Sequence, residues 1–383
     1  MQRRRRHLAA MSHAARPHRL VLVGGGHAHV LVLRALAQRP DPLLQVTIVS
    51  TARHATYSGM VPGAIARQYQ LADAQIDLEA LARRAQQASI EAAVVAIDRD
   101  RHVLHLSDGA ELPYDSASFD TGSDSARTAA IEPGAPLVAL KPIDAAVRRL
   151  DAALATPPPA HGRRIVVVGA GAAGAEVALA LAARLRGEPS GSITLCGDAD
   201  HPVLERGPRT ARIVCRVLQE RGIAFLGGVR AKRVTPSAVC LHDGRELAAD
   251  LVVWATGAGG TGLFADAGLP VDRHGFLEVS DELRCPAQPE IFAAGDCATL
   301  IPYPDLPKAG VFAVREAPIL DHNLRAAARG HALRRYRPQR RFLALLNTCD
   351  GQAVLSYGAL AWRGRAAWRL KDWIDRRFVA QFR

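Results

Sequence analysis

Two glycine-rich stretches decide the fold: LVLVGGGHAHVLVLR at residues 20–34 and RIVVVGAGAAGAEVALAL at residues 164–181. In each stretch an apolar run meets a glycine turn, and a helical pattern of apolar residues follows. A second apolar run comes after a short proline-containing break, at residues 45–50 and again at 192–196. Strand, helix and strand in this order predict a βαβ unit of a parallel sheet. Two such units predict an α/β fold with two Rossmann-like dinucleotide-binding domains.

The internal repeat extends beyond these units. An Asp-Gly pair at residues 108–109, and another at 243–244, predicts a hairpin turn in each copy. Each copy then ends in a strand and a glycine, in SFDTGS at 118–123 and VVWATGAG at 252–259. The two halves of the chain therefore carry the same sequence of elements.

The second glycine motif is complete, with Gly169, Gly171 and Gly174 at the positions of G-x-G-x-x-G. The first glycine allows a tight turn, the second lets a pyrophosphate approach the backbone, and the third lets the helix pack closely on the strand. Free N–H groups at the start of the helix would bind phosphates. A packed turn without a ligand is the alternative, and the strand before the motif and the helix after it favour the nucleotide site.

The first motif keeps Gly24 and Gly26 but has His29 in place of the third glycine. A side chain there has to point away from the strand or pack sideways, and a structural turn with a surface histidine is the alternative. We expect this turn, with His27, to bind a dinucleotide. A metal site formed by His27 and His29 is not expected, because two residues so spaced at a helix start face different ways.

The residues at the ends of the second strands, Ser50 and Cys196, are not acidic. Ser50 could still bond a ribose hydroxyl, and Arg206 and Arg209 could accept a 2′-phosphate at the second site, so NAD and NADP both stay open. Gly295-Asp296, after a short apolar run, fits a longer dinucleotide: its carboxylate would accept hydroxyl hydrogen bonds from the sugar-alcohol chain of FAD. An N-capping aspartate is the competing interpretation.

The net charge, the length of the apolar runs and the cysteine spacing exclude several classes of protein. The net charge of +12 comes almost wholly from arginine, because the chain has only four lysines. Such a charge attracts polyanions, but no nucleic-acid recognition motif is found. No apolar run is long enough to span a membrane. The six cysteines form no C-x-x-C pair and no metal-ligand spacing, which favours a reduced cytoplasmic setting and no metal.

We expect the following organisation along the chain: a disordered basic arm at 1–18, the first part of an FAD-binding domain at 19–130, a linker at 131–162, an NAD(P)-binding domain at 163–262, the second part of the FAD-binding domain at 263–330, and a small C-terminal α+β segment at 331–383. The tail WRGRAAWRLKDWIDRRFVAQFR mixes tryptophans with arginines. It fits an amphipathic helix that rests on the inner face of a membrane, although aromatic residues at helical spacing more often pack on the chain's own core.

The order of glycine turn, D-T-G, second glycine turn, A-T-G and G-D-C-A resembles the two-dinucleotide-binding flavoproteins, which include the pyridine nucleotide-disulfide oxidoreductases and the type II NADH dehydrogenases. The blocks GGGHAHVLVLR, TYSGMVPGAIARQY, KAGVFAVREAPILDHNL and WRLKDWIDRRF resemble a subfamily of oxidoreductases found beside, or fused to, selenophosphate synthase. The chain departs from the first group in lacking C-x-x-C, and we expect no attached synthase domain.

This resemblance implies a set of cofactor contacts. FAD would be bound by residues 20–50, 120–123 and 295–296, and NAD(P)H by residues 165–260. Glu176 would lie near the nicotinamide, and Tyr57 and Ser58 near the flavin ring, with Lys308 and Val311 at its pyrimidine edge. Further contacts are expected from Thr121, Gly122 and Gly257.

We therefore expect an FAD-dependent enzyme that takes hydride from NAD(P)H and passes electrons to a quinone or a small sulfur or selenium compound. FAD carries the chemistry, so no catalytic side chain stands out beyond the candidates Lys308 and Glu176. One alternative is a sulfide:quinone-type reductase that does not use NAD(P)H. Another is a non-enzymatic flavin-binding redox partner of selenophosphate synthase.

Overall fold

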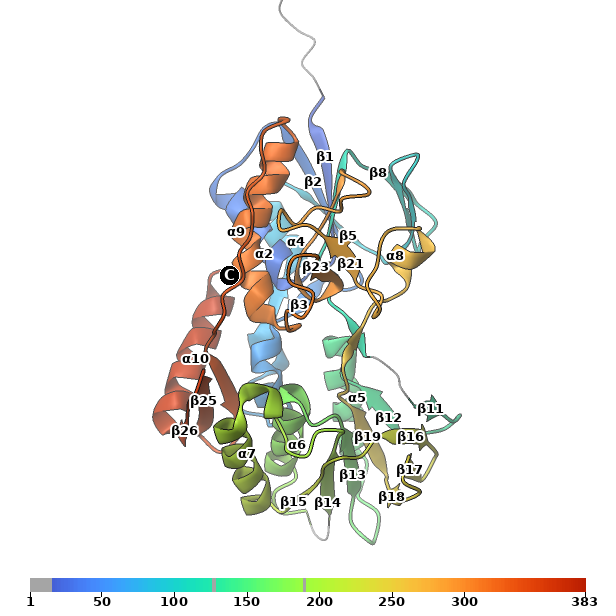
Figure 1. Cartoon of the computed structure of the whole chain (residues 1–383), viewed down its shortest axis with the longest axis vertical. Coiled ribbons are helices and arrows are strands. Elements are labelled where there is room, and N and C mark those ends of the chain that lie inside the picture. Colours follow the sequence, from blue (N-terminus) through green and yellow to red (C-terminus); the bar gives the residue numbers. More distant parts are fainter. Residues whose placement is uncertain (1–15, 126–128, 189–190) are drawn as a thin grey trace, which may run out of the picture.

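The computed structural model describes residues 16–125, 129–188 and 191–383. Most of the expected basic arm, residues 1–15, lies outside the described residues. The molecule has two units stacked along its long axis, with the C-terminal segment along one side of both (Figure 1). No helix among the described residues combines the length and hydrophobicity that a bilayer crossing requires.

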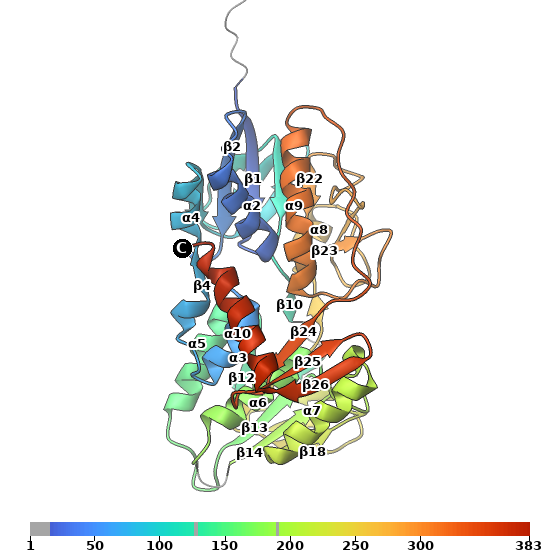
Figure 2. The ribbon, with the colours of Figure 1, turned by 90° about the vertical axis from the view of Figure 1, so that its left-hand side faces the viewer.

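The first unit is built on a five-stranded parallel sheet. Its strand order is β22-β9-β1-β2-β5, with bounds Ile291–Ala293, Ser116–Phe119, His18–Val23, Leu44–Ser50 and Ala88–Glu91. Helices α2 (His27–Gln38) and α9 (Gly310–Ala327) lie side by side against it (Figure 2). The apolar runs read from the sequence are its buried central strands.

The second unit repeats this arrangement in four of its five strands, and its edge strand β12 comes before the glycine turn in the chain, whereas β22 comes last. Its sheet has the order β12-β19-β13-β14-β15, also parallel, with bounds Leu137–Ala139, Leu251–Trp254, Arg164–Val168, Ser192–Cys196 and Ile223–Leu226. Helix α6 (Ala172–Arg184) follows the second glycine turn as α2 follows the first. Both predicted βαβ units are confirmed by parallel pairing, of β1 with β2 and of β13 with β14.

Each unit also carries an antiparallel sheet, and both predicted hairpins are confirmed. In the first unit the order is β6-β7-β8, with bounds Val94–Asp98, Val103–Leu106 and Glu111–Pro113. In the second it is β11-β16-β17-β18, with bounds Ala130–Ile131, Ala231–Val234, Ala238–Leu241 and Glu246–Ala248. Strands β16, β17 and β18 pair antiparallel, and the edge strand β11 pairs parallel with β16.

Several short elements complete the two units. The strands are β3 (His54–Thr56), β4 (Gln75–Asp77), β21 (Leu277–Val279) and β23 (Ala298–Leu300); the helices are η1 (Ser58–Met60), α3 (Val61–Ile65), η2 (Leu71–Ala74), α4 (Leu78–Arg84), η3 (Leu204–Arg206), α7 (Pro208–Glu220), α8 (Leu263–Asp266) and η4 (Gly295–Cys297).

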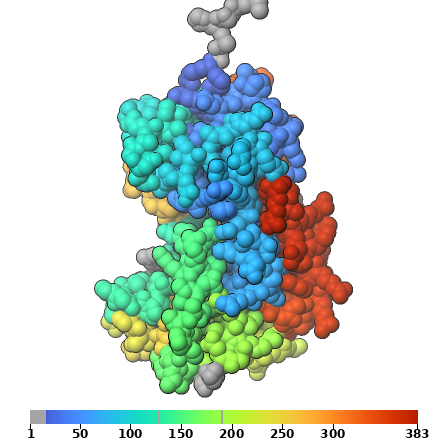
Figure 3. Space-filling view, turned by 180° about the vertical axis from the view of Figure 1, so that it is seen from behind, coloured from blue at the N-terminus to red at the C-terminus, as the bar shows by residue number. Residues whose placement is uncertain are grey.

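The segment 131–162 does more than connect the units. It supplies β12 to the edge of the second sheet and then forms helix α5 (Ile143–Ala155). Helix α3 of the first half lies beside α5 and buries Val61 and Ile65 in the second unit's core. Seen from behind, the blue segment of the first half and the green segment that contains α5 lie side by side (Figure 3). The boundary in space therefore differs from the boundary in sequence.

Two short strands join the units. Strand β10 (Asp124–Ser125) follows β9, and β20 (Ala258–Gly259) follows β19; the two pair antiparallel. This pairing brings the carboxyl edges of both parallel sheets to one junction.

The C-terminal segment is a three-stranded antiparallel sheet followed by a helix: β24 (Ala344–Asn347), β25 (Ala353–Tyr357), β26 (Leu360–Gly364) and α10 (Arg365–Ala380). Lys371 of α10 is buried; its Nζ lies 2.8 Å from Asp375 Oδ2 and donates to Gly59 O at 2.7 Å. Asp375 also accepts from the Tyr57 hydroxyl at 3.1 Å. The ion pair lies within α10, and its bonds to Gly59 and Tyr57 fasten this helix to the segment before α3.

Replacing Lys371 with methionine leaves the Asp375 carboxylate buried without its cation. We expect Lys371→Met to lower the free energy of unfolding by about 3–5 kcal/mol in urea denaturation at pH 7. Arg369→Met, an exposed change on the same helix, is the matched control and should change stability little. Equal stability of the two variants would contradict this assignment.

Candidate dinucleotide sites

The glycines of the first turn make room for Asp120, which directly follows β9. Gly24 has φ +94°, and a Cβ there would lie 2.4 Å from Asp120 O. A Cβ on Gly26 would lie 2.1 Å from Asp120 Cγ. Both distances are far below van der Waals contact, so a larger residue at either position would displace Asp120.

His29 supports this turn from inside. Its side chain is fully buried, with Nδ1 2.8 Å from Gly24 O and Nε2 2.9 Å from Ser118 Oγ. Burial lowers the pKa of His29 to about 4, so the ring is neutral at pH 7. A carbonyl only accepts hydrogen bonds, so Nδ1–H donates to Gly24 and Nε2 accepts from Ser118.

The alternative of a surface histidine is therefore wrong, because the ring packs sideways beneath the turn. Both of its nitrogens are bonded to protein atoms, so His29 shapes the site instead of offering its ring to a cofactor. In the second turn the same place is close-packed: a Cβ on Gly174 would lie 1.8 Å from Gly169 O. At the equivalent place in the first turn, the His29 ring bonds to Gly24 O.

Each of the two helices that follow a glycine turn carries a carboxylate at its N-terminus. Asp120 Oδ2 accepts from the N–H groups of Ala28 at 2.7 Å and His29 at 3.2 Å in α2. Glu205 Oε1 accepts from Ala172 N at 3.1 Å in α6. A carboxylate is stabilised there by the unpaired N–H groups and the helix dipole. Asp120 is buried, whereas Glu205 is exposed and can move away.

The loop before α7 places Glu205. Val203 N donates to Ala170 O of the glycine turn at 2.8 Å, and the Val203 side chain is buried despite a φ of +57°. A β-branched residue at positive φ is strained. This loop, with η3, therefore folds over the second turn.

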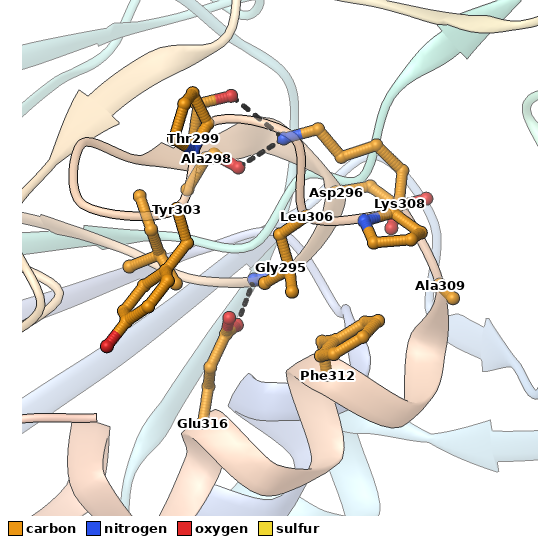
Figure 4. A pocket seen from close by; sticks show the side chains of 13 residues that line it. Gly295, Asp296, Ala298, Thr299, Tyr303, Leu306, Lys308, Ala309, Phe312 and Glu316 are labelled. Carbon is orange, nitrogen blue, oxygen red and sulfur yellow. Dashed lines mark hydrogen bonds between the residues drawn. The ribbon is translucent and has the colours of Figure 1, made fainter. Parts of the chain in front are cut away.

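Gly295 and Asp296 form the start of η4 beside the first turn. Gly295 N donates to Glu316 Oε2 at 2.7 Å (Figure 4). Asp296 lies inside η4 and its carboxylate is 3.1 Å from Lys141 Nζ, which also donates to Ser123. No side-chain cap is formed at this helix, so the N-cap interpretation is wrong and the carboxylate stays beside Lys141.

Lys308 does not present its ammonium group as a free cation. It donates to Ala298 O and Thr299 Oγ1, the latter at 3.0 Å (Figure 4). It also lies 4.1 Å from the centre of the Phe276 ring. Burial lowers its pKa. A catalytic role for Lys308 has no support in this geometry, and Val311, in the first turn of α9, is half-buried.

His27 is the clearest sign that this site holds a ligand. Its Nε2 is buried and has no hydrogen-bond partner among the described residues. The ring packs 5.4 Å from Tyr57 and 5.9 Å from Phe378, and a Cβ on Gly310 would lie 3.3 Å from it. An unpaired buried nitrogen between the starts of α2 and α9 fits a polar group of a bound cofactor.

Glu176 lies at the junction of the units and is half-buried. Its Oε1 accepts from Asn347 N at 2.7 Å, and burial raises its pKa to about 7. Asn347 also donates to Gln68 through its side chain. Sequence reasoning did not single out Asn347, and only its place in the short apolar run of β24 marked it.

Five of the remaining expected contacts lie at or just after the carboxyl ends of the parallel strands: Ser50, Thr121, Gly122, Gly171 and Gly257. Ser58 begins η1. Arg206 and Arg209 are used by the C-terminal segment. Arg206 stacks 4.5 Å over Phe342, and Arg209 donates to Ala359 O.

Among the residues that the structure describes, no group of three His, Cys, Asp or Glu side chains could hold a metal ion. All six cysteines are free. Cys297 Sγ donates to Phe119 O and Ala294 O, and burial raises its pKa to about 12. It is therefore a thiol at neutral pH and no nucleophile.

Removing the His29 ring leaves Gly24 O and the Ser118 hydroxyl buried without partners. We expect His29→Ala to lower the free energy of unfolding by about 2–4 kcal/mol, measured by urea denaturation. Gln38→Ala, an exposed change on the same helix, is the control. A loss within the control's range would show that the ring does not support the turn.

The chain matches a family of known proteins over a range that includes both glycine turns. The family model described as pyridine nucleotide-disulphide oxidoreductase matches residues 18–317. An NADH dehydrogenase-like protein of Mycobacterium tuberculosis is 30% identical over 300 residues, which cover 73% of this chain and 72% of that protein.

Two solved structures share the fold. NDH2 from Plasmodium falciparum in complex with NADH has a TM-score of 0.80 at 14% identity, covering 96% of this chain and 98% of that one. The sulfide:quinone oxidoreductase of Aquifex aeolicus has a TM-score of 0.79 at 18% identity, covering 96% and 91%.

The family confirms the expected class of enzyme and its cofactors, FAD and NAD(P)H. The match over most of the sequence and the two glycine turns on two matching sheets lead to one assignment: the chain belongs to the pyridine nucleotide-disulphide oxidoreductase family.

Proposed function

We propose that this enzyme takes hydride from NAD(P)H at the second unit onto FAD at the first, and that a small acceptor, with a quinone as the leading candidate, is reduced directly. The observation that carries the proposal is the pairing of β10 with β20. Dinucleotides bind at the carboxyl edges of parallel sheets, and this pairing brings the two edges to one junction.

The residues of the first unit fit FAD. The glycine turn and the N-terminus of α2 suit a pyrophosphate, and His27 Nε2 is a buried nitrogen in need of a partner. Asp296 and Lys141 offer an acceptor and a donor for hydroxyl groups. When bound, FAD supplies the electron-transfer chemistry, while these side chains bind and orient it.

At the junction of the two units, aromatic side chains exclude water and Glu176 carries a titratable carboxyl group. Tyr57 stacks 4.5 Å from Phe378, and together they form an apolar wall beside His27. Glu176, with its pKa near 7, can hold or release a proton at neutral pH. It is a residue for positioning the nicotinamide, and its protonation would follow the charge brought to the junction.

The cysteines support direct reduction of the acceptor. A sulfide- or disulfide-type mechanism needs thiols that converge on the flavin, and Cys297, beside the first site, is buried with its Sγ donating to two backbone carbonyls. The resemblance in fold to a sulfide:quinone oxidoreductase therefore does not extend to its redox thiols in our proposal. A quinone, or another small oxidised compound, would react with the flavin itself.

The outer face of the C-terminal segment favours a quinone dissolved in a bilayer. Trp373 is 59% exposed and Leu360 55% exposed, and Trp362 is also exposed. These side chains lie on α10 and β26 among several arginines. Amphipathic surfaces of this kind rest on anionic lipid, so peripheral membrane contact is part of the proposal.

An anaerobic titration tests the proposed reaction. We expect the isolated, FAD-loaded protein to lose its flavin absorbance on addition of NADH or NADPH, and to regain it when a soluble quinone is added. Cys297→Ala should reduce and reoxidise as the wild type does. Flavin that neither nucleotide bleaches would contradict the proposal, and running both nucleotides settles their preference.

Glu205 bonds a backbone N–H of the helix start that would receive the pyrophosphate of NAD(P)H. We expect Glu205→Gln to tighten NADH binding by about three- to tenfold, because a like charge at this N-terminus is removed. The dissociation constant of the FAD-loaded protein would be measured by calorimetry. Glu246→Gln, the same charge change on a distant exposed strand, is the control; weaker binding by Glu205→Gln would mean that this carboxylate helps to hold the nucleotide.

A further inference from the structure

We propose that Asp120 takes up a proton when FAD binds, so that a neutral carboxyl group lies beneath the cofactor. The inference rests on the FAD site described above and adds a charge-compensating residue to it. It makes the affinity for FAD dependent on pH in the neutral range.

The first argument is geometric. Asp120 is 3% exposed and is enclosed by three glycines from the two expected FAD motifs. A Cβ on Gly26 would lie 2.1 Å from its Cγ, and a Cβ on Gly295 would lie 2.6 Å from its Oδ1. A Cβ on Gly24 would lie 2.4 Å from the backbone oxygen of Asp120. The carboxyl group therefore fills the space between the first glycine turn and η4, where the two motifs meet.

The second argument concerns the charges that face Asp120. They come from three elements: His29 on α2, Asp296 and Cys297 on η4, and Glu316 on α9. His29 is neutral, since its pKa is lowered to about 4 by burial, and Cys297 is a thiol. Of the two lysines in this region, Lys141 pairs with Asp296, and Lys308 is held by Ala298 and Thr299.

Within the part of the chain that the structure describes, Asp120 is thus a buried carboxylate that no cation faces. Burial raises its pKa to about 7, while the N–H groups of His29 and Ala28 act in the opposite direction. The nearby carboxylates of Glu316 and Asp296 raise it further. The group is therefore close to half protonated at pH 7 before any cofactor binds.

FAD adds two negative charges at the same helix start, because its pyrophosphate binds where the N–H groups of α2 point. A like charge favours the neutral form of a carboxyl group. The carboxylate takes one proton from solvent and becomes a carboxylic acid; no bond in FAD changes. Its Oδ2 can still accept from Ala28 and His29, and the added hydrogen gives the site a donor.

The sign of the pH dependence follows. Below pH 7 Asp120 is mostly protonated before binding, so the affinity for FAD is nearly constant. Above pH 7 binding must take up a proton, so the dissociation constant rises by about tenfold per pH unit. At pH 8 the uptake approaches about 0.9 proton per FAD, and at pH 6 it falls to about 0.1.

The test uses full-length protein freed of FAD and titrated with FAD between pH 6 and 8.5. We expect the wild-type dissociation constant to rise above pH 7 as stated, and Asp120→Asn, a neutral mimic of the acid, to bind FAD with an affinity that does not change with pH. Glu316→Gln is the matched control, since it neutralises the other buried carboxylate at Gly295; it should keep the slope. A slope that persists in Asp120→Asn, or that disappears in Glu316→Gln, would overturn the assignment to Asp120.

Calorimetry of the wild type in two buffers of different ionisation enthalpy measures the proton uptake directly and needs no variant. Uptake near the stated values supports the inference, and no uptake at pH 8 overturns it. Tight FAD binding without pH dependence would contradict this inference and would leave the proposed function unaffected. A protein that binds no FAD at any pH would contradict the proposed function as well.

Discussion

The structure of the first unit depends on one buried interaction, the Asp120 carboxylate held by the N–H groups of Ala28 and His29. It fixes the start of α2 against β9, and the His29 ring then ties Gly24 to Ser118. Gly26 and Gly295 have no side chain because this carboxylate takes the space. Two glycine motifs, far apart in sequence, are thus adapted to one acid.

The two units share the order of four parallel strands, β9-β1-β2-β5 in the first and β19-β13-β14-β15 in the second. They differ in the charge that lies at the helix after the glycine turn. In the second unit the complete glycine motif leaves no polar side chain of its own at the start of α6. The exposed side chain of Glu205, on the loop that contains Val203, bonds to this helix start. In the first unit the acid is internal and permanent. A removable carboxylate suits a nucleotide that must come and go with each turnover, whereas an internal one suits a cofactor that stays bound.

Local patterns were enough to predict both βαβ units, the two hairpins and the positions of the glycine turns, because these rest on neighbours in sequence. The contacts that shape the sites join residues far apart: Asp120 is 92 positions from Ala28, and Asp375 is 318 from Tyr57. Nothing near Lys141 or Asn347 in sequence marks them as site residues. His29 stands out in the sequence because it breaks the glycine motif. In the structure its ring makes two hydrogen bonds at the place where Gly174 packs closely in the second turn.

A crystal structure of the FAD complex tests the central claim most directly. This account predicts the pyrophosphate over the turn at residues 24–27, with His27 Nε2 bonded to the cofactor and Asp120 still beneath the N-terminus of α2. FAD bound away from this turn, or an Asp120 side chain expelled from between Gly26 and Gly295 to admit it, would contradict the claim.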